Sequence, residues 1–232
     1  MDFRDRTIVV TGGTGALGTA VVGALLEAGA AACRIPYMHE DEAKRFAHRD
    51  HKRVTLVGPC QLSDEAQVGR LYGDLPQLWA SIHIAGGFSM SPVAKTDKAL
   101  LMAQLDTNLV SCFLCCRAAV NKMGQSGGRI VNVAARPALE WRSGAGMAAY
   151  TASKAAVAAL TVALAEEVAK EGILVNAVAP SIMDTPANRA AMPKADFAAW
   201  PKVEEVAATI LFLASPDNRV TRGAIVPVYG KS

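Results

Sequence analysis

The sequence predicts an α/β fold: a single doubly wound domain whose seven-stranded, mainly parallel sheet is flanked by helices on both faces. Short β-branched runs alternate with longer segments rich in alanine and leucine over all 232 residues. The short runs are apolar throughout, which is typical of strands that helices cover on both faces. Strands that alternate with helices favour a parallel sheet with right-handed crossover connections.

Seven runs supply the strands, in chain order: TIVVTG, AACRIPY, RVTLVG, ASIHIAG, GRIVNVA, ILVNAVAP and AIVPVYG. Helical stretches lie between them, for example over residues 16–28 and 150–171. No repeat, low-complexity linker or change of composition divides the chain. We therefore expect one domain over residues 1–232.

Composition and charge exclude several function classes. Hydrophobic residues make up 51% and charged residues 19% of the chain, which favours a compact protein over a disordered one. The net charge of +3 comes without a basic cluster, so we expect neither a nucleic-acid nor a membrane partner. No transmembrane run or signal peptide is recognisable, and the charged N-terminus passes directly into a strand. The expected location is cytoplasmic.

The five cysteines fit that compartment. Cys112, Cys115 and Cys116 share one helical face, and no histidine is near them in the sequence. Because a metal site needs ligands that converge from more than one segment, we expect buried, reduced thiols instead. The histidines show no metal-binding spacing and are expected to be structural or exposed: His39, His48, His51 and His83. No metal is predicted.

A glycine-rich turn joins the first strand to the first helix in VVTGGTGALGTAVVGALL, where Gly12, Gly15 and Gly18 stand three residues apart. Glycines here allow a tight turn, the close approach of a diphosphate and close packing of helix on strand. Free backbone N–H groups and the helix dipole favour the negative charge. Since the turn follows the first of seven strands, it predicts a Rossmann-like dinucleotide site.

The end of the second strand leaves the choice between NADH and NADPH open. Dinucleotide folds often carry an acidic residue there that binds the ribose hydroxyls, whereas this chain has Pro36. Arg34 and His39 are candidates for contact with a 2′-phosphate, although Arg34 can equally point away. The acidic residues come later and are expected to begin a helix: Glu40, Asp41 and Glu42.

Over essentially its full length the chain resembles a short-chain dehydrogenase/reductase. The matching features are the glycine turn, IAGG at residues 84–87, Asn108 in LDTNLVSCFL, Tyr150-x-x-x-Lys154, and VNAVAPS followed by Thr185. Two features depart from the family. His83 and Ile84 replace an Asn-Asn pair that many members carry. Many members also have, near the position of Gln61, an aspartate that holds the adenine, and this chain lacks it.

The resemblance implies bound NAD(P)H, a small-molecule substrate and a homodimer or homotetramer. The alanine-rich helix at residues 148–169 is the family's usual contact between subunits, although its small residues can also serve packing on the sheet. The implied coenzyme site consists of Gly12, Thr14, Gly15, Ala16, Leu17, Gly18, Ala85, Gly86, Gly87, Tyr150, Lys154, Pro180, Ile182 and Thr185.

Three stretches resemble one branch of the family, the quinonoid dihydropteridine reductases. These are GGTGALG, the doubled glycine of IAGGF, and MDTPANRAAMPKADFAAW at residues 183–200. The branch also lacks a serine that most of the family carries after the fifth strand, where this chain has Ala135. Asn108 and Pro36 do not match the branch.

Tyr150, Lys154 and Asn108 are the candidate catalytic residues. Tyr150 and Lys154 are four residues apart and share one face of a helix. A lysine ammonium stabilises phenolate, so we expect a lowered pKa and a better acid–base group at Tyr150. The resemblance implies that Lys154 also binds the nicotinamide ribose and that Asn108 helps to hold a relay water.

The missing serine bears on the substrate. Hydride attack on a ketone leaves charge on oxygen, and losing one hydrogen-bond donor to that charge costs about 10²–10³ in rate. A conjugated imine such as quinonoid dihydropterin ends with a proton on nitrogen, so a single acid, Tyr150, suffices. Ser143 is the alternative donor, or else a polar turn residue beside Gly144.

The segment at about 180–201 follows the sixth strand at the edge where open α/β sheets bind ligands, and its length is typical of a lid. Trp141 and Trp200 either wall a flat ring or pack within their loops. Thr185 either meets the nicotinamide carboxamide, as the resemblance implies, or caps a short helix after Pro186.

Together these features predict an NAD(P)H-dependent reductase of a dihydropterin-like conjugated imine. The alternatives are a short-chain reductase of another carbonyl or imine, and a coenzyme-binding protein with little catalysis. Retention of the tyrosine–lysine pair argues against the last, since a silent binder has no need of it.

Overall fold

A computed structural model describes all residues, 1–232. Seven parallel strands form one sheet in the order β3-β2-β1-β4-β5-β6-β7. The strands are β1 Thr7–Thr11, β2 Ala32–Pro36, β3 Val54–Val57, β4 Ala80–His83, β5 Gly128–Val133, β6 Ile173–Pro180 and β7 Ile225–Val228. The predicted fold class and all seven predicted strands are confirmed.

Eight α-helices flank the sheet: α1 Ala16–Glu27, α2 Glu40–Arg45, α3 Glu65–Gly73, α4 Lys98–Leu105, α5 Ser111–Met123, α6 Ala148–Glu167, α7 Pro186–Ala191 and α8 Val203–Ala214. Side chains set several of the starts. The Asp64 carboxylate accepts from the backbone N–H of Gln67 to cap α3, and Asp97 caps α4 in the same way through Leu100.

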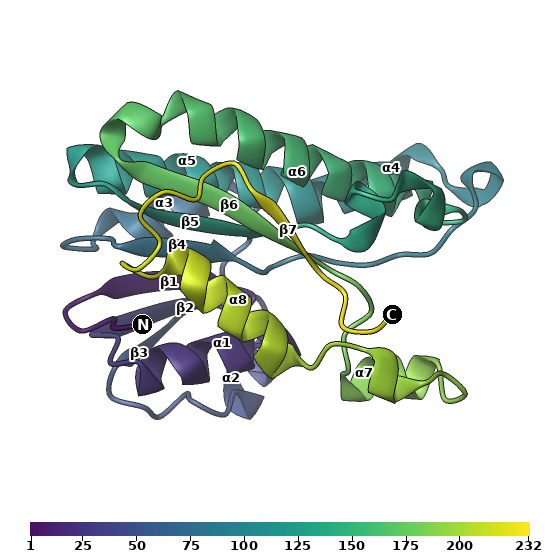
Figure 1. The fold of residues 1–232 in the computed structure, drawn as a ribbon, viewed down its shortest axis with the longest axis horizontal. Helices are drawn as coiled ribbons and strands as arrows, with labels where there is room; N and C mark the ends of the chain where they lie inside the picture. Colours follow the sequence, from purple (N-terminus) through teal and green to yellow (C-terminus); the bar gives the residue numbers. More distant parts are fainter.

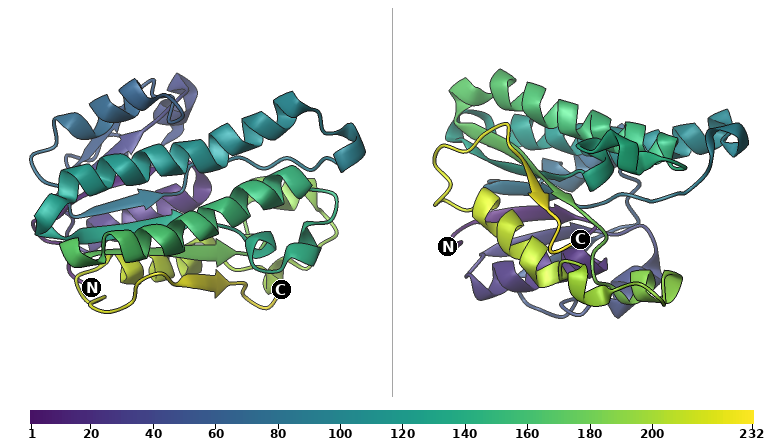
Figure 2. Two further views of the ribbon diagram at one scale, coloured as in Figure 1. Left: turned by 90° about the horizontal axis from the view of Figure 1, so that it is seen from above. Right: turned by 45° about the vertical axis from the view of Figure 1, so that its right-hand side comes forward.

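The helices cover the sheet as two layers. One face carries α1 and α8, which pack against each other, and the other carries α3, α5 and α6 (Figure 1). Seen from above in Figure 2, α5 and α6 run side by side across the sheet. Apolar side chains of both layers are fully buried against the strands, for example Leu25 and Ile210 on one face and Leu71 on the other. This burial on both faces explains why the strands read as apolar runs.

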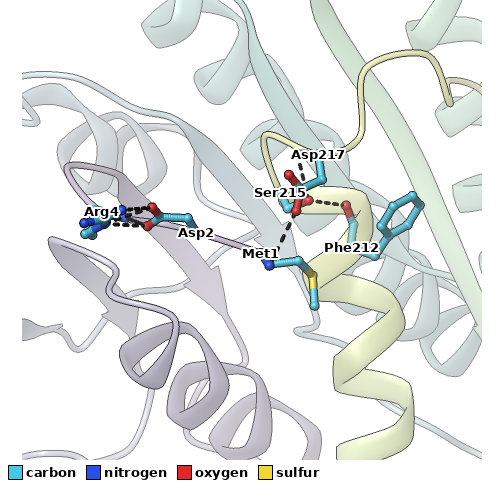
Figure 3. A network of polar contacts seen from close by, with 6 residues as sticks. All are labelled: Met1, Asp2, Arg4, Phe212, Ser215 and Asp217. Atoms are coloured by element: carbon cyan, nitrogen blue, oxygen red, sulfur yellow. Dashed lines mark hydrogen bonds and ion pairs between the residues drawn. The ribbon is translucent and has the colours of Figure 1, made fainter.

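The amino edge of the sheet lies opposite the ligand-binding edge and is held by polar contacts (Figure 3). The amino group of Met1 pairs with the Asp217 carboxylate at 3.5 Å. The backbone N–H of Asp217 donates to Ser215 Oγ, which donates to the carbonyl of Phe212 at the end of α8. The start of the chain is thereby joined to α8.

Two helical segments are apolar and long enough to cross a membrane by length and composition alone, contrary to the sequence expectation. They are Lys98–Ser126 and Ala148–Glu167, with mean hydropathies of 1.5 and 1.4. Leucine and alanine supply much of this hydropathy. Both segments pack on the sheet through fully buried residues such as Ala119 and Ala165, as core helices do.

Candidate active site

A cleft of about 670 Å³ opens at the carboxyl ends of β1 and β4. These strands are neighbours in the sheet but distant in sequence, so the chain changes direction here. Open α/β sheets bind ligands at such switch points. The cleft is lined by several predicted coenzyme residues: Gly12, Thr14, Gly15, Ala16, Leu17, Gly18, Ala85 and Gly86.

The glycine turn has the geometry of an anion cradle. Gly12 has a φ of +66°, and a Cβ there would stand 2.6 Å from the backbone nitrogen of Ala85. The helix α1 starts after Gly15, which offers no side-chain cap, and its first turn carries no acidic residue. The first N–H groups of the helix therefore lack a side-chain acceptor at the cleft, which suits a diphosphate.

Arg34 lies on β2. Its guanidinium pairs with the Asp74 carboxylate and also donates to the carbonyl of Leu71. Of the two alternatives for Arg34, the structure therefore agrees with the one in which it points away from the cleft. His39 and Arg45 do line the cleft, at the two ends of α2, which begins at Glu40 as predicted.

Gln61 also lines the cleft. Its side-chain amide donates to Ser63 Oγ at 2.7 Å. An adenine contact from Gln61 would have to share this donor group.

Lys154 lies at the inner wall of the active site, 6% exposed. Its Nζ donates to the carbonyl of Val133 at 2.8 Å, which uses one of three ammonium donors. Burial lowers the pKa of Lys154 to about 8, and Cys112 acts in the opposite direction. Two ammonium donors therefore remain.

Tyr150 differs from the sequence expectation in its acidity. Burial raises the pKa of Tyr150 to about 12, whereas we expected Lys154 to lower it. The lysine Nζ is held by Val133 instead. The phenol is therefore fully protonated at neutral pH and suited to donate a proton.

Phe88 covers this tyrosine and was not singled out by the sequence. The two rings meet edge to face, with centroids 5.0 Å apart and planes at 82°. Phe88 is nevertheless 63% exposed, so it stands between Tyr150 and solvent. The only sequence signal was its place directly after the doubled glycine of IAGGF.

Asn108 is fully buried in a π-helical turn, Asp106–Val110, between α4 and α5. Its side-chain oxygen accepts from the N–H of Gly87, and its amide donates to the carbonyl of Gly87 and to Ser153 Oγ. Ser153 Oγ in turn donates to the carbonyl of Tyr150. Asn108 thus ties the segment after β4 to the helix that carries Tyr150.

Neither Ala135 nor Ser143 offers a free hydrogen-bond donor in place of the missing serine hydroxyl. Ala135 is buried after β5 and presents a methyl group. Ser143 is exposed, and its hydroxyl donates to the carbonyl of Glu140 at 2.7 Å. Ser143 therefore has the role of a turn residue in this structure.

The segment at 180–201 contains α7 and folds on itself. Thr185 Oγ1 accepts from the N–H of Asn188 and caps α7, which is the helix-cap alternative of the sequence analysis. Trp200 is buried, and its ring centroid lies 5.1 Å from that of Phe197. Trp200 thus packs within its own loop and does not stack on a ring in the cleft. Pro180 is buried at the end of β6, and Ile182 is exposed.

Trp141 is 72% exposed and lies outside the cleft. Its indole N–H donates to the carbonyl of Ala138, three residues earlier. This contact also belongs to packing within the loop.

Cys112 and Cys116 are buried as expected, and a histidine that is distant in the sequence lies beside them. His83, at the end of β4, brings Nδ1 to 3.5 Å from Cys116 Sγ. Both thiols also face the side-chain oxygen of Asn132 on β5. The sheet thus assembles a cluster that sequence spacing does not reveal.

Comparison with known proteins shows what the chain is similar to. A profile described as short chain dehydrogenase matches residues 6–196. A galactitol 2-dehydrogenase of Rhizobium johnstonii is 35% identical over 95% of this chain and 92% of its own length. A 3beta-hydroxysteroid dehydrogenase of Mediterraneibacter gnavus is 31% identical over 98% of this chain and 95% of its own.

Among solved structures, that of ElxO with NADP bound superposes with a TM-score of 0.86. It is 25% identical in sequence, and the match covers 97% of each chain. The similarity therefore extends over the whole sheet and both helical layers.

Proposed function

The chain belongs to the short-chain dehydrogenase family and is an NAD(P)-dependent oxidoreductase; from this premise we propose that it reduces a conjugated imine of the quinonoid dihydropterin kind, with Tyr150 as the proton donor. Ala135 carries this proposal. When hydride adds to a ketone, the carbonyl oxygen becomes a negatively charged alkoxide, and a methyl group cannot donate a hydrogen bond to it. Reduction of an imine does not form this alkoxide.

The residues present fit a nicotinamide coenzyme. The turn at Gly12–Gly18 would hold the diphosphate, and Lys154 has free donors for the ribose. The bound coenzyme supplies the hydride. His39 and Arg45 at the cleft are suited to a 2′-phosphate, and the similar ElxO structure contains NADP, so we expect NADPH to bind at least as well as NADH.

Each catalytic residue has a separate task in this proposal. Tyr150, protonated because burial raises its pKa to about 12, donates H⁺ to the substrate nitrogen. Lys154 stabilises the phenolate that Tyr150 becomes on giving up its proton, since an ammonium group favours a nearby negative charge. Asn108 positions the helix through Gly87 and Ser153.

We further propose a homo-oligomer and a mobile lid at about 180–201. Apolar side chains stand exposed on the helices of one layer, including Phe113 on α5 and Val162 on α6. The lid would contribute Ile182 and Thr185 beside the coenzyme. A cytoplasmic, small-molecule enzyme without nucleic-acid or membrane partners is consistent with these features.

The deciding experiment compares quinonoid dihydropterin with a panel of small ketones, each with NADH and with NADPH. We expect turnover of the pterin and little of the ketones. Ala135→Ser should raise ketone turnover by about 10²–10³-fold, the usual worth of one oxyanion donor, and leave the pterin rate unchanged. Ser143→Ala is the control and should change neither rate. Equal gains on both substrates from Ala135→Ser would refute the explanation.

A carbonyl or alcohol substrate is the second candidate, because the two dehydrogenases compared above are named for hydroxylated substrates. Ketone turnover by the wild type without pterin turnover would favour it. A coenzyme-binding protein with little catalysis is tested by Tyr150→Phe. Loss of about 10²–10⁴ in rate with unchanged coenzyme binding would exclude that class.

A further inference from the structure

Four ligand-type atoms converge behind Lys154, between the sheet and α5. They are His83 Nδ1 on β4, Asn132 Oδ1 on β5, and the Sγ atoms of Cys112 and Cys116 on α5. The histidine nitrogen and the two sulfurs all lie within 4.8 Å of one another, and all three residues are buried. None of these side chains has a task in the proposed reaction.

The cluster converges on the side-chain oxygen of Asn132. Its Oδ1 lies 2.8 Å from His83 Nδ1, 3.3 Å from Cys112 Sγ and 3.5 Å from Cys116 Sγ. Its orientation is set because its amide donates to Thr161 Oγ1. One oxygen, one ring nitrogen and two sulfurs therefore face a common point in the core.

Apart from the 2.8 Å between His83 Nδ1 and Asn132 Oδ1, which must lengthen when a cation enters, the separations match a metal coordination shell. With Zn–S of about 2.3 Å and Zn–N of about 2.0 Å, tetrahedral ligands stand roughly 3.5 Å apart. His83 Nδ1 and Cys116 Sγ are 3.5 Å apart, and both Asn132–sulfur distances are close to this value. Nitrogen and thiolate ligands are those that Zn²⁺ prefers.

We propose that His83, Cys112 and Cys116 form a buried binding site for a thiophilic divalent cation of the Zn²⁺ type, with the Asn132 carbonyl at the fourth corner. Binding replaces the two thiol protons, which leave for solvent, and no electron is transferred. Two thiolates neutralise the ion, so the site adds no net charge beside Lys154.

The surroundings supply the support that such a site needs. His83 Nε2 lies 2.7 Å from Ser81 Oγ, which lies 2.7 Å from the Tyr72 hydroxyl. With its proton on Nε2, the histidine donates to Ser81 and leaves Nδ1 free as a ligand.

Co²⁺ is the probe, since thiolate ligation gives it a strong near-ultraviolet charge-transfer absorption. Because the site is buried, the full chain is unfolded and refolded with Co²⁺, or with Zn²⁺ for metal analysis. We expect one metal ion per chain after dialysis, a thiolate charge-transfer band with Co²⁺, and release of two protons per Zn²⁺ bound.

The variants separate the site from general thiol binding. Cys116→Ser and His83→Asn should abolish the band, and the asparagine preserves a polar side chain at this buried place. Ser81→Ala should weaken binding about 10–100-fold, as loss of a supporting hydrogen bond to a ligand does. Cys115→Ser is the matched control, since Cys115 is equally buried on α5 but lies outside the cluster, and it should keep the band.

Two results would overturn the proposal. One is wild-type protein, shown by circular dichroism to have refolded, that retains no metal and gives no band. The other is a band that persists in His83→Asn or that disappears in Cys115→Ser, because the metal would then be bound elsewhere.

Discussion

Lys154 and Tyr150 show how burial sets the acid–base chemistry of single residues. The lysine is almost completely enclosed and keeps one hydrogen bond, to Val133. The tyrosine shares the enclosure, so burial disfavours the charged form of both: the pKa of the lysine falls and that of the phenol rises. At neutral pH the phenol therefore carries its proton, and Lys154 has a pKa close to the pH. This state favours reduction, in which the phenol gives up a proton.

The pH dependence of reduction follows from these values. The pKa of Lys154 is about 8, so its positive charge is present below that pH and is lost above it. We expect kcat/KM for reduction to fall as pH rises through about 8, because the lysine no longer stabilises the developing phenolate. Tyr150 stays protonated over this range and does not contribute to the fall.

Steady-state kinetics over that range tests this dependence, with circular dichroism at each pH as the control for folding. A rate constant that stays level for a full unit above the pKa of Lys154 would show that its charge is not needed.

At the scale of elements, α1 and the turn before it depend on backbone contact. A Cβ on Gly18 would collide with the carbonyl oxygen of Gly12, which is backbone and cannot rotate aside. The turn must therefore move, and the N–H groups at the start of the helix move with it. Sequence spacing alone indicated this contact, because close packing of helix on strand is one of the roles of such glycines.

Gly18→Ala should accordingly reduce coenzyme affinity by at least about tenfold, the equivalent of 1.4 kcal/mol, while the sheet still forms. Quenching of NADPH fluorescence measures the affinity. Gly69→Ala in α3 is the matched control, because a Cβ there meets no atom within 4 Å. The control should bind normally and gain about 1 kcal/mol in unfolding free energy, since alanine is the better helix former. Unchanged affinity in Gly18→Ala would contradict the assigned role of the turn.

At the scale of the whole molecule, the helical layer that contains α5 and α6 exposes apolar side chains to solvent. Phe113 is 49% and Val162 is 45% exposed. If these side chains form one patch, such a patch would be typical of a contact between protein chains.

We expect Phe113→Glu combined with Val162→Glu to convert an oligomer into monomers, because burying two carboxylates at an interface is costly. Sedimentation velocity measures the assembly state. Val220→Glu is the control, since Val220 is 84% exposed outside these helices. A wild type that sediments as a monomer, or a double variant that still assembles, would disprove the proposed interface.

The sequence alone determined the strand order along the chain, the parallel sheet and the glycine turn, because these follow from local periodicity and from short-range backbone geometry. It also placed Tyr150 and Lys154 on one face of α6, since helical spacing is local. It could not decide which way Arg34 points, that Ser143 is held by Glu140, or what acidity the phenol has. Those depend on neighbours from distant segments and on burial.

The cluster of His83 with Cys112 and Cys116 is the clearest case of what only the tertiary structure decided. Its members lie on a strand and a helix about 30 residues apart, and they meet because β4 pairs with β5 beneath α5. Pairing across a sheet is set by the packing of the complete core, which no local pattern in the chain encodes.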